Sequence, residues 1–104
     1  MTYEQECEAA IDEQGLRAPR EALRAVGHEP DVEQTGGMVM VLYVNRSLDT
    51  ARLGVTVSCE VDDRDLFMVC FYRDEDADGE TISEACDLHA LIWLAHAFKR
   101  GVLG

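Results

Sequence analysis

The segment from residue 51 to residue 61 alternates along its whole length between apolar residues and polar residues or glycine. Its apolar members are Ala51, Leu53, Val55, Val57, Cys59 and Val61. A repeat of two residues is the period of a β-strand, and it places these side chains on one face of the strand. The chain therefore has to build a sheet with one buried face.

Two segments flank this strand, Met38 to Asn45 and Leu66 to Arg73, and each is apolar on both faces. Short polar turns at 45–50 and 62–65 connect the three segments. Turns of this length are typical of antiparallel hairpins, because parallel strands need a long crossover connection. We therefore predict a three-stranded antiparallel meander over residues 38–73.

The loop between the second and third strands decides which side chains of the third strand face the core. With a four-residue loop between the first two strands and a two-residue loop between the second and third, the core face also receives Met38, Met40, Leu42, Val44, Leu66, Met68, Cys70 and Tyr72. The opposite face then carries Val39, Val41, Tyr43, Phe67, Val69 and Phe71. That face is too apolar to stay fully hydrated. We expect the chain's own N-terminal helices, a second subunit or another partner to cover it.

Helices are predicted before the sheet. Thr2 and Gln5 match a capping box, and glycines at positions 15 and 27 end two short helices within residues 1–27. The arginines at positions 17, 20 and 24 form a basic row, which we interpret as neutralising the acidic helix beside it. Residues 28–37 contain a proline and two glycines, and we predict that they form a linker.

A longer helix is predicted after the sheet. Thr81 and Glu84 match a second capping box, and residues 88–98 are apolar apart from two histidines. We therefore predict a helix over residues 81–100 that packs on the sheet, with Trp93 anchored in the core. The predicted fold is a single α+β domain over residues 1–104, in the order α-α-β-β-β-α.

Charge limits the classes of partner. The chain has 21 acidic and 9 basic residues, a net charge of −12. This charge disfavours direct binding to nucleic acid or to an anionic membrane, and it favours a basic protein partner. The absence of a long apolar run and of a signal-peptide pattern favours a cytoplasmic location. The simpler alternative is that acidity only keeps a small protein soluble.

The function that we expect from these features is non-catalytic binding to a basic surface of another protein. Small phage inhibitors, including anti-CRISPR and nucleic-acid-mimic proteins, share this size and charge, which is an analogy without a shared motif. An acidic, chaperone-like homodimer is the alternative. The candidate partner-binding residues are Glu4, Glu8, Asp12, Asp74, Glu75, Asp76, Val39, Val41, Tyr43, Phe67 and Phe71.

One motif points to a metal ion. Residues 74–79 match the opening of a calcium loop, D-x-D-x-D-G, with Asp74, Asp76 and Asp78 as candidate ligands. The match fails at the twelfth position, where Ala85 stands in place of a bidentate glutamate. A solvated acidic turn is the alternative. We expect no other cofactor and no catalysis, because the common nucleotide-binding, metalloprotease and hydrolase motifs are missing.

Overall fold

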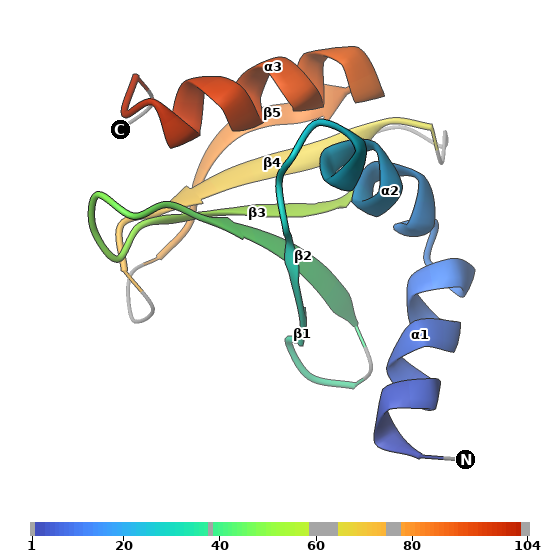
Figure 1. Ribbon diagram of the computed structural model, residues 1–104. Coiled ribbons are helices and arrows are strands. Elements are labelled where there is room, and N and C mark those ends of the chain that lie inside the picture. Colours follow the sequence, from blue (N-terminus) through green and yellow to red (C-terminus); the bar gives the residue numbers. More distant parts are fainter. Residues whose placement is uncertain (1, 38, 59–64, 75–77, 103–104) are drawn as a thin grey trace.

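The computed structural model describes residues 2–37, 39–58, 65–74 and 78–102. Three helices and five strands follow one another in the order α-α-β-β-β-β-β-α (Figure 1). The helices are α1 (Tyr3–Glu13), α2 (Arg17–Ala25) and α3 (Leu88–Lys99). The strands are β1 (Asp31–Gln34), β2 (Met40–Asn45), β3 (Arg52–Val57), β4 (Phe67–Tyr72) and β5 (Glu80–Cys86). The predicted α+β class is confirmed, whereas the prediction of three strands is wrong.

The five strands form one antiparallel sheet in the order β1-β2-β3-β4-β5. The first additional strand, β1, lies in the segment that we predicted to be a linker. Three of its four residues are polar, so its sequence carries little strand signal. The pairing of Val32 with Leu42 and of Glu33 with Val41 places β1 at the edge of the sheet.

The second additional strand, β5, occupies the start of the predicted C-terminal helix. The capping box predicted from Thr81 and Glu84 does not form, because both residues belong to a strand that pairs with β4. Helix α3 begins later, and the side chain of Asp87 caps it by accepting a hydrogen bond from the backbone N–H of Ala90 at 2.8 Å. The predicted end of the helix is confirmed, since Arg100 is its C-cap.

The register corrects the prediction for one strand. Leu42 pairs with Val55 and Val44 with Leu53, so the predicted core face of β2 and β3 is confirmed. Phe71 pairs with Leu53 and Phe67 with Val57, so Phe67, Val69 and Phe71 face the core. Met68, Cys70 and Tyr72 face the opposite way. The predicted two-residue loop was wrong by an odd number of residues, and such a slip reverses every side chain of a strand.

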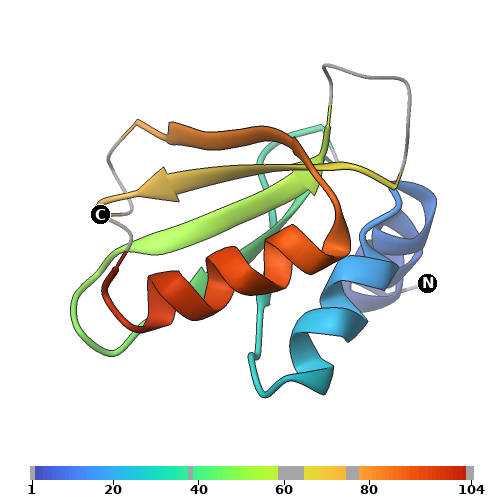
Figure 2. The ribbon, with the colours of Figure 1, turned by 90° about the horizontal axis from the view of Figure 1, so that it is seen from above.

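All three helices contribute to one core on the same face of the sheet (Figures 1 and 2). Ile11 of α1, Leu23 of α2 and Leu91 of α3 are almost fully buried there against the sheet. The N-terminal helices therefore do not cover the opposite face, contrary to one of our expectations. Trp93 is not a core anchor either, because 64% of it is exposed on the solvent side of α3. No helix in the described part of the chain combines the length and the apolar run that crossing a bilayer requires.

A buried arginine attaches the end of α3 to the turn after β2. The guanidinium of Arg46 donates to the backbone oxygen of Phe98 at 3.1 Å and to both carboxylate oxygens of Asp49, at 2.9 and 2.8 Å. It also lies 4.5 Å from the centre of the Phe98 ring. The side chain is only 4% exposed, so these contacts replace nearly all of its hydration.

Candidate functional site

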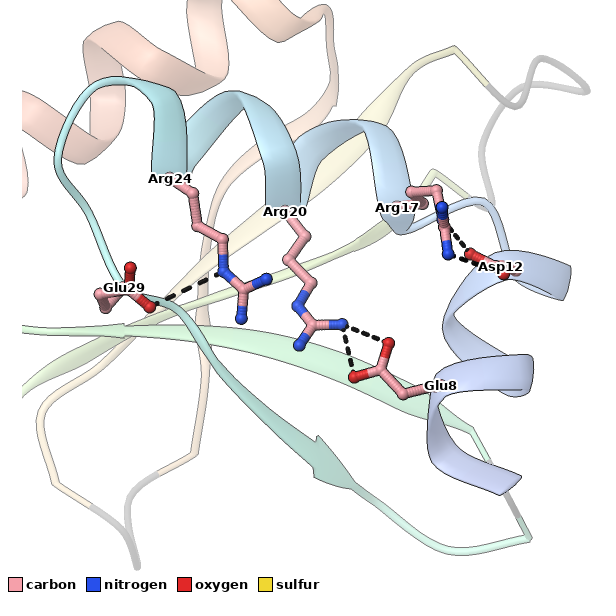
Figure 3. A network of polar contacts seen from close by, with 6 residues as sticks. All are labelled: Glu8, Asp12, Arg17, Arg20, Arg24 and Glu29. Atoms are coloured by element: carbon pink, nitrogen blue, oxygen red, sulfur yellow. Dashed lines mark hydrogen bonds and ion pairs between the residues drawn. The ribbon is translucent and has the colours of Figure 1, made fainter. Parts of the chain in front are cut away.

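The structure uses two of the three predicted acidic residues of α1 in internal ion pairs (Figure 3). Arg20 of α2 donates from Nη1 to both carboxylate oxygens of Glu8, at 2.8 and 2.7 Å. Arg17 forms a two-point contact with Asp12, in which Nη2 lies 3.2 Å from Oδ2. The interpretation that the arginine row neutralises the acidic helix is therefore confirmed for these two pairs.

These ion pairs hold α1 against α2 and change the titration of the groups involved. The hydrogen bond from Arg20 lowers the pKa of Glu8, and the hydrogen bond to Asp12 raises the pKa of Arg17. Three of these four side chains are about half-exposed or more, so water screens both pairs and they add little to stability. Their main consequence is for function, because carboxylates that are already paired attract a partner less strongly.

A groove of about 610 Å³ lies between α1 and β1, and its lining includes the predicted residues Glu4 and Glu8. Its apolar lining comes from Tyr3 and Cys7 of α1 and Val32 of β1. Its acidic border comes from Glu4 and Glu8. The apolar side chains offer contact surface to a ligand, and the acidic border favours positive charge.

The walls of this groove are connected by a side-chain hydrogen bond. Gln34 of β1 donates from Nε2 to the hydroxyl of Tyr3 at 3.1 Å. Tyr3 is nevertheless 62% exposed, so much of its ring is available to a ligand. Glu4 is exposed on the same helix, and it makes no ion pair with the residues that the structure describes. The groove was not predicted from the sequence, because strand β1, which forms one of its walls, was predicted to be a linker.

The apolar face that we predicted from Val39, Val41, Tyr43, Phe67 and Phe71 is not assembled. The two phenylalanines lie in the core, and exposed Val39 precedes β2. Val41 and Tyr43 do lie on the face opposite the helices, where they are buried. The prediction of a homodimer loses the apolar face that motivated it and stays a prediction.

An arginine and two tyrosines fill the centre of this opposite face. The guanidinium of Arg52 lies 3.8 Å from the centre of the Tyr43 ring, and its Nη1 donates to Glu33 at 2.9 Å. The Tyr43 and Tyr72 rings meet edge to face at 5.7 Å. Burial raises the pKa of Tyr72. Because Arg52 is itself only 14% exposed, the cluster covers its own apolar surface and leaves less for a partner.

The calcium site predicted in the acidic loop before β5 lies only partly within the described residues. Glu75 and Asp76 lie outside the described residues, as do Met38, Cys59 and Val61 from the predicted core set. Of the other predicted ligands, Asp78 is exposed and Asp74 is half-buried. In the described ranges, no three histidine, cysteine, aspartate or glutamate residues lie close enough to hold a metal together. The calcium hypothesis stays a prediction.

Comparisons with known proteins add no further constraint. No protein-family model, no curated protein and no solved structure matches this chain. A function for this chain is therefore inferred from its own residues and their geometry.

Proposed function

We propose that this protein is a non-catalytic binding protein that takes a basic segment of a partner protein into the groove between α1 and β1. The observation that carries the proposal is the combination of Tyr3, Cys7 and Val32 with the carboxylate of Glu4, which makes no ion pair with the described residues, around one groove. Apolar contacts would supply most of the affinity, whereas the carboxylates would speed association and select the partner.

The edge position of β1 supports an extended conformation for the bound segment. The backbone N–H of Thr35 donates to the oxygen of Val39 at 2.9 Å, which makes these residues a hydrogen-bonded pair. Hydrogen-bonded pairs alternate along an antiparallel ladder, so the backbone groups of Val32 point away from β2. An extended peptide can pair with such an edge, as in other sheet-edge recognition.

Charge balance supports a basic partner over an acidic one. Arg17, Arg20 and Arg24 are each paired with a carboxylate, so they do not offset the charge of Glu4 at the groove. A partner that itself binds nucleic acid has the required basic surface. An inhibitor that blocks such a surface is therefore one form of this function.

The test uses a defined probe, a six-residue peptide of alternating lysine and valine. Two-dimensional NMR of the labelled full chain should show chemical-shift changes concentrated on α1 and β1, and the affinity should fall with added salt. Glu4→Gln should weaken binding by about 1.4- to 5-fold, since an exposed charge pair contributes ~0.2–1 kcal/mol. Glu84→Gln on exposed β5 is the matched control and should change nothing.

Peptides of altered composition separate the two contributions. Alternating lysine and serine should bind more weakly, because the apolar lining then has no counterpart, and alternating glutamate and valine should not bind. Shift changes spread evenly over the acidic surface, or equal effects of the two substitutions, would contradict the groove and leave only a non-specific attraction between charges.

A further inference from the structure

Two histidines that are distant in the sequence meet between α2 and α3. Nε2 of His28 lies 3.2 Å from Nδ1 of His96, and the ring centres are 4.8 Å apart with 49° between the ring planes. His28 is only 6% exposed, whereas His96 lies on the exposed side of α3. The pair therefore has one buried member and one member at the surface.

The backbone fixes both members of the pair. His28 follows Gly27, whose φ of +92° ends α2, and the backbone N–H of His28 donates to the oxygen of Leu23 at 2.9 Å. Leu23 is fully buried in the core. His96 lies on α3 between two buried alanines, so its helix position is equally fixed. The short distance between the rings is thus a product of the fold.

Each imidazole presents one ring nitrogen to the other. Burial, together with the positive charges that His96 and Lys99 can carry, lowers the pKa of His28. In the neutral pair, one nitrogen donates a hydrogen bond to the other. If each ring instead keeps its proton on the remote nitrogen, Nδ1 of His28 and Nε2 of His96, both facing nitrogens keep a free lone pair.

We propose that His28 and His96 form a two-point site for a borderline divalent ion such as Zn²⁺. Zinc–imidazole bonds measure about 2.0–2.1 Å, so nitrogens 3.2 Å apart subtend roughly 100–105° at the ion. That angle lies between the values for tetrahedral and octahedral coordination. The described residues supply no third ligand, so water completes the shell and the affinity is modest.

The positive charge of Lys99 repels a bound cation, and removing that charge provides a specific test of the proposal. It lies three residues after His96 on α3, and its charge acts on His28. Lys99→Gln keeps both ligands and removes the repulsion, so it should tighten Zn²⁺ binding by several-fold. A site formed by the acidic residues elsewhere would not respond in this way.

The experiment titrates Zn²⁺ into the full chain after treatment with a chelator. At a hundred times its dissociation constant, Zn²⁺ should raise Tm by about 10 °C. His96→Asn removes the exposed ligand with little risk to the core, and it should abolish the shift. His89→Asn, on exposed surface of the same helix, is the matched control and should retain it.

Two further measurements separate the pair from the carboxylates. The ¹⁵N resonances of His28 Nε2 and His96 Nδ1 should move on adding Zn²⁺, while those of His89 stay in place. Ca²⁺, which prefers oxygen ligands, should produce no comparable rise in Tm. The proposal is overturned by an unchanged Tm with Zn²⁺, by an equal shift in His96→Asn, or by an equal effect of Ca²⁺.

Discussion

Replacing Gly54 with alanine tests the packing on the sheet face opposite the helices. Gly54 lies in the middle of β3, and an added Cβ would lie 2.8 Å from Cε2 of Tyr72 and 3.2 Å from Cε1 of Tyr43. Neither ring can move away easily. Arg52 lies over the Tyr43 ring. Gly79 lies so near the Tyr72 ring that a Cβ added to it would be 2.7 Å from Cε1 of that ring. The substitution should therefore force a strained arrangement of the cluster.

Two effects of opposite sign determine the result of this substitution. Overpacking of a filled site typically costs ~1–3 kcal/mol. Alanine offsets part of this, because it restricts the unfolded chain and suits a strand better than glycine, together worth about 0.4–1 kcal/mol. We therefore expect Gly54→Ala to lower the free energy of unfolding by about 1–2 kcal/mol, and Tm by roughly 5–15 °C.

Urea denaturation of four chains tests the reasoning: the parent, Gly54→Ala, Tyr72→Leu and the double variant. Tyr72→Leu removes the ring edge that the new Cβ meets. In that background Gly54→Ala should cost less than half as much, which gives a measurable coupling between the two sites. A neutral or stabilising Gly54→Ala, or the same cost in both backgrounds, would refute the proposed contact.

Two other predictions concern the ion pairs. Arg46 and the backbone N–H of Ala51 hold the pKa of Asp49 below its usual value, so its contribution to stability is present above about pH 4 and is lost as the pH falls through the folded-state pKa. Asp49→Asn should lower Tm at pH 7, with a difference that shrinks towards pH 2; a difference independent of pH would contradict this. A double-mutant cycle of Glu8→Gln and Arg20→Met should give a coupling of about 0.2–1 kcal/mol in urea denaturation, and zero coupling would mean that the pair does not stabilise the fold.

The sequence predicts those elements whose signal is local. The capping box of Thr2 and Gln5 forms, with both side-chain hydrogen bonds present. The alternating strand around Leu53 and Val55 faces the core as its pattern requires. In both cases a few neighbouring residues carry the information, so no knowledge of distant contacts is needed.

Pairing between distant segments overrides weaker local signals. Thr81 and Glu84 match a capping box, yet they belong to a strand that pairs with the outer edge of β4. Strand β4 is apolar on both faces, so its sequence does not fix its own register. The prediction for Phe67 and Phe71 failed for this reason, since one misjudged loop length reversed their direction.

The candidate sites depend on contacts that no motif records. The groove requires β1, a strand of mostly polar residues. His28 and His96 are 68 residues apart and meet only because α2 and α3 pack together. Such a pair can be recognised only from the folded structure, in which the two imidazoles lie at the spacing of metal ligands.

The placement of the arginines shows which of the negative charges are balanced within the chain. Each of five arginines forms an ion pair with a carboxylate of the same chain, and they are Arg17, Arg20, Arg24, Arg46 and Arg52. Their charges are therefore balanced locally, and a partner meets mainly the remaining carboxylates. The proposed function uses these carboxylates to attract a basic partner, and Glu4 at the edge of the groove is where they border apolar residues.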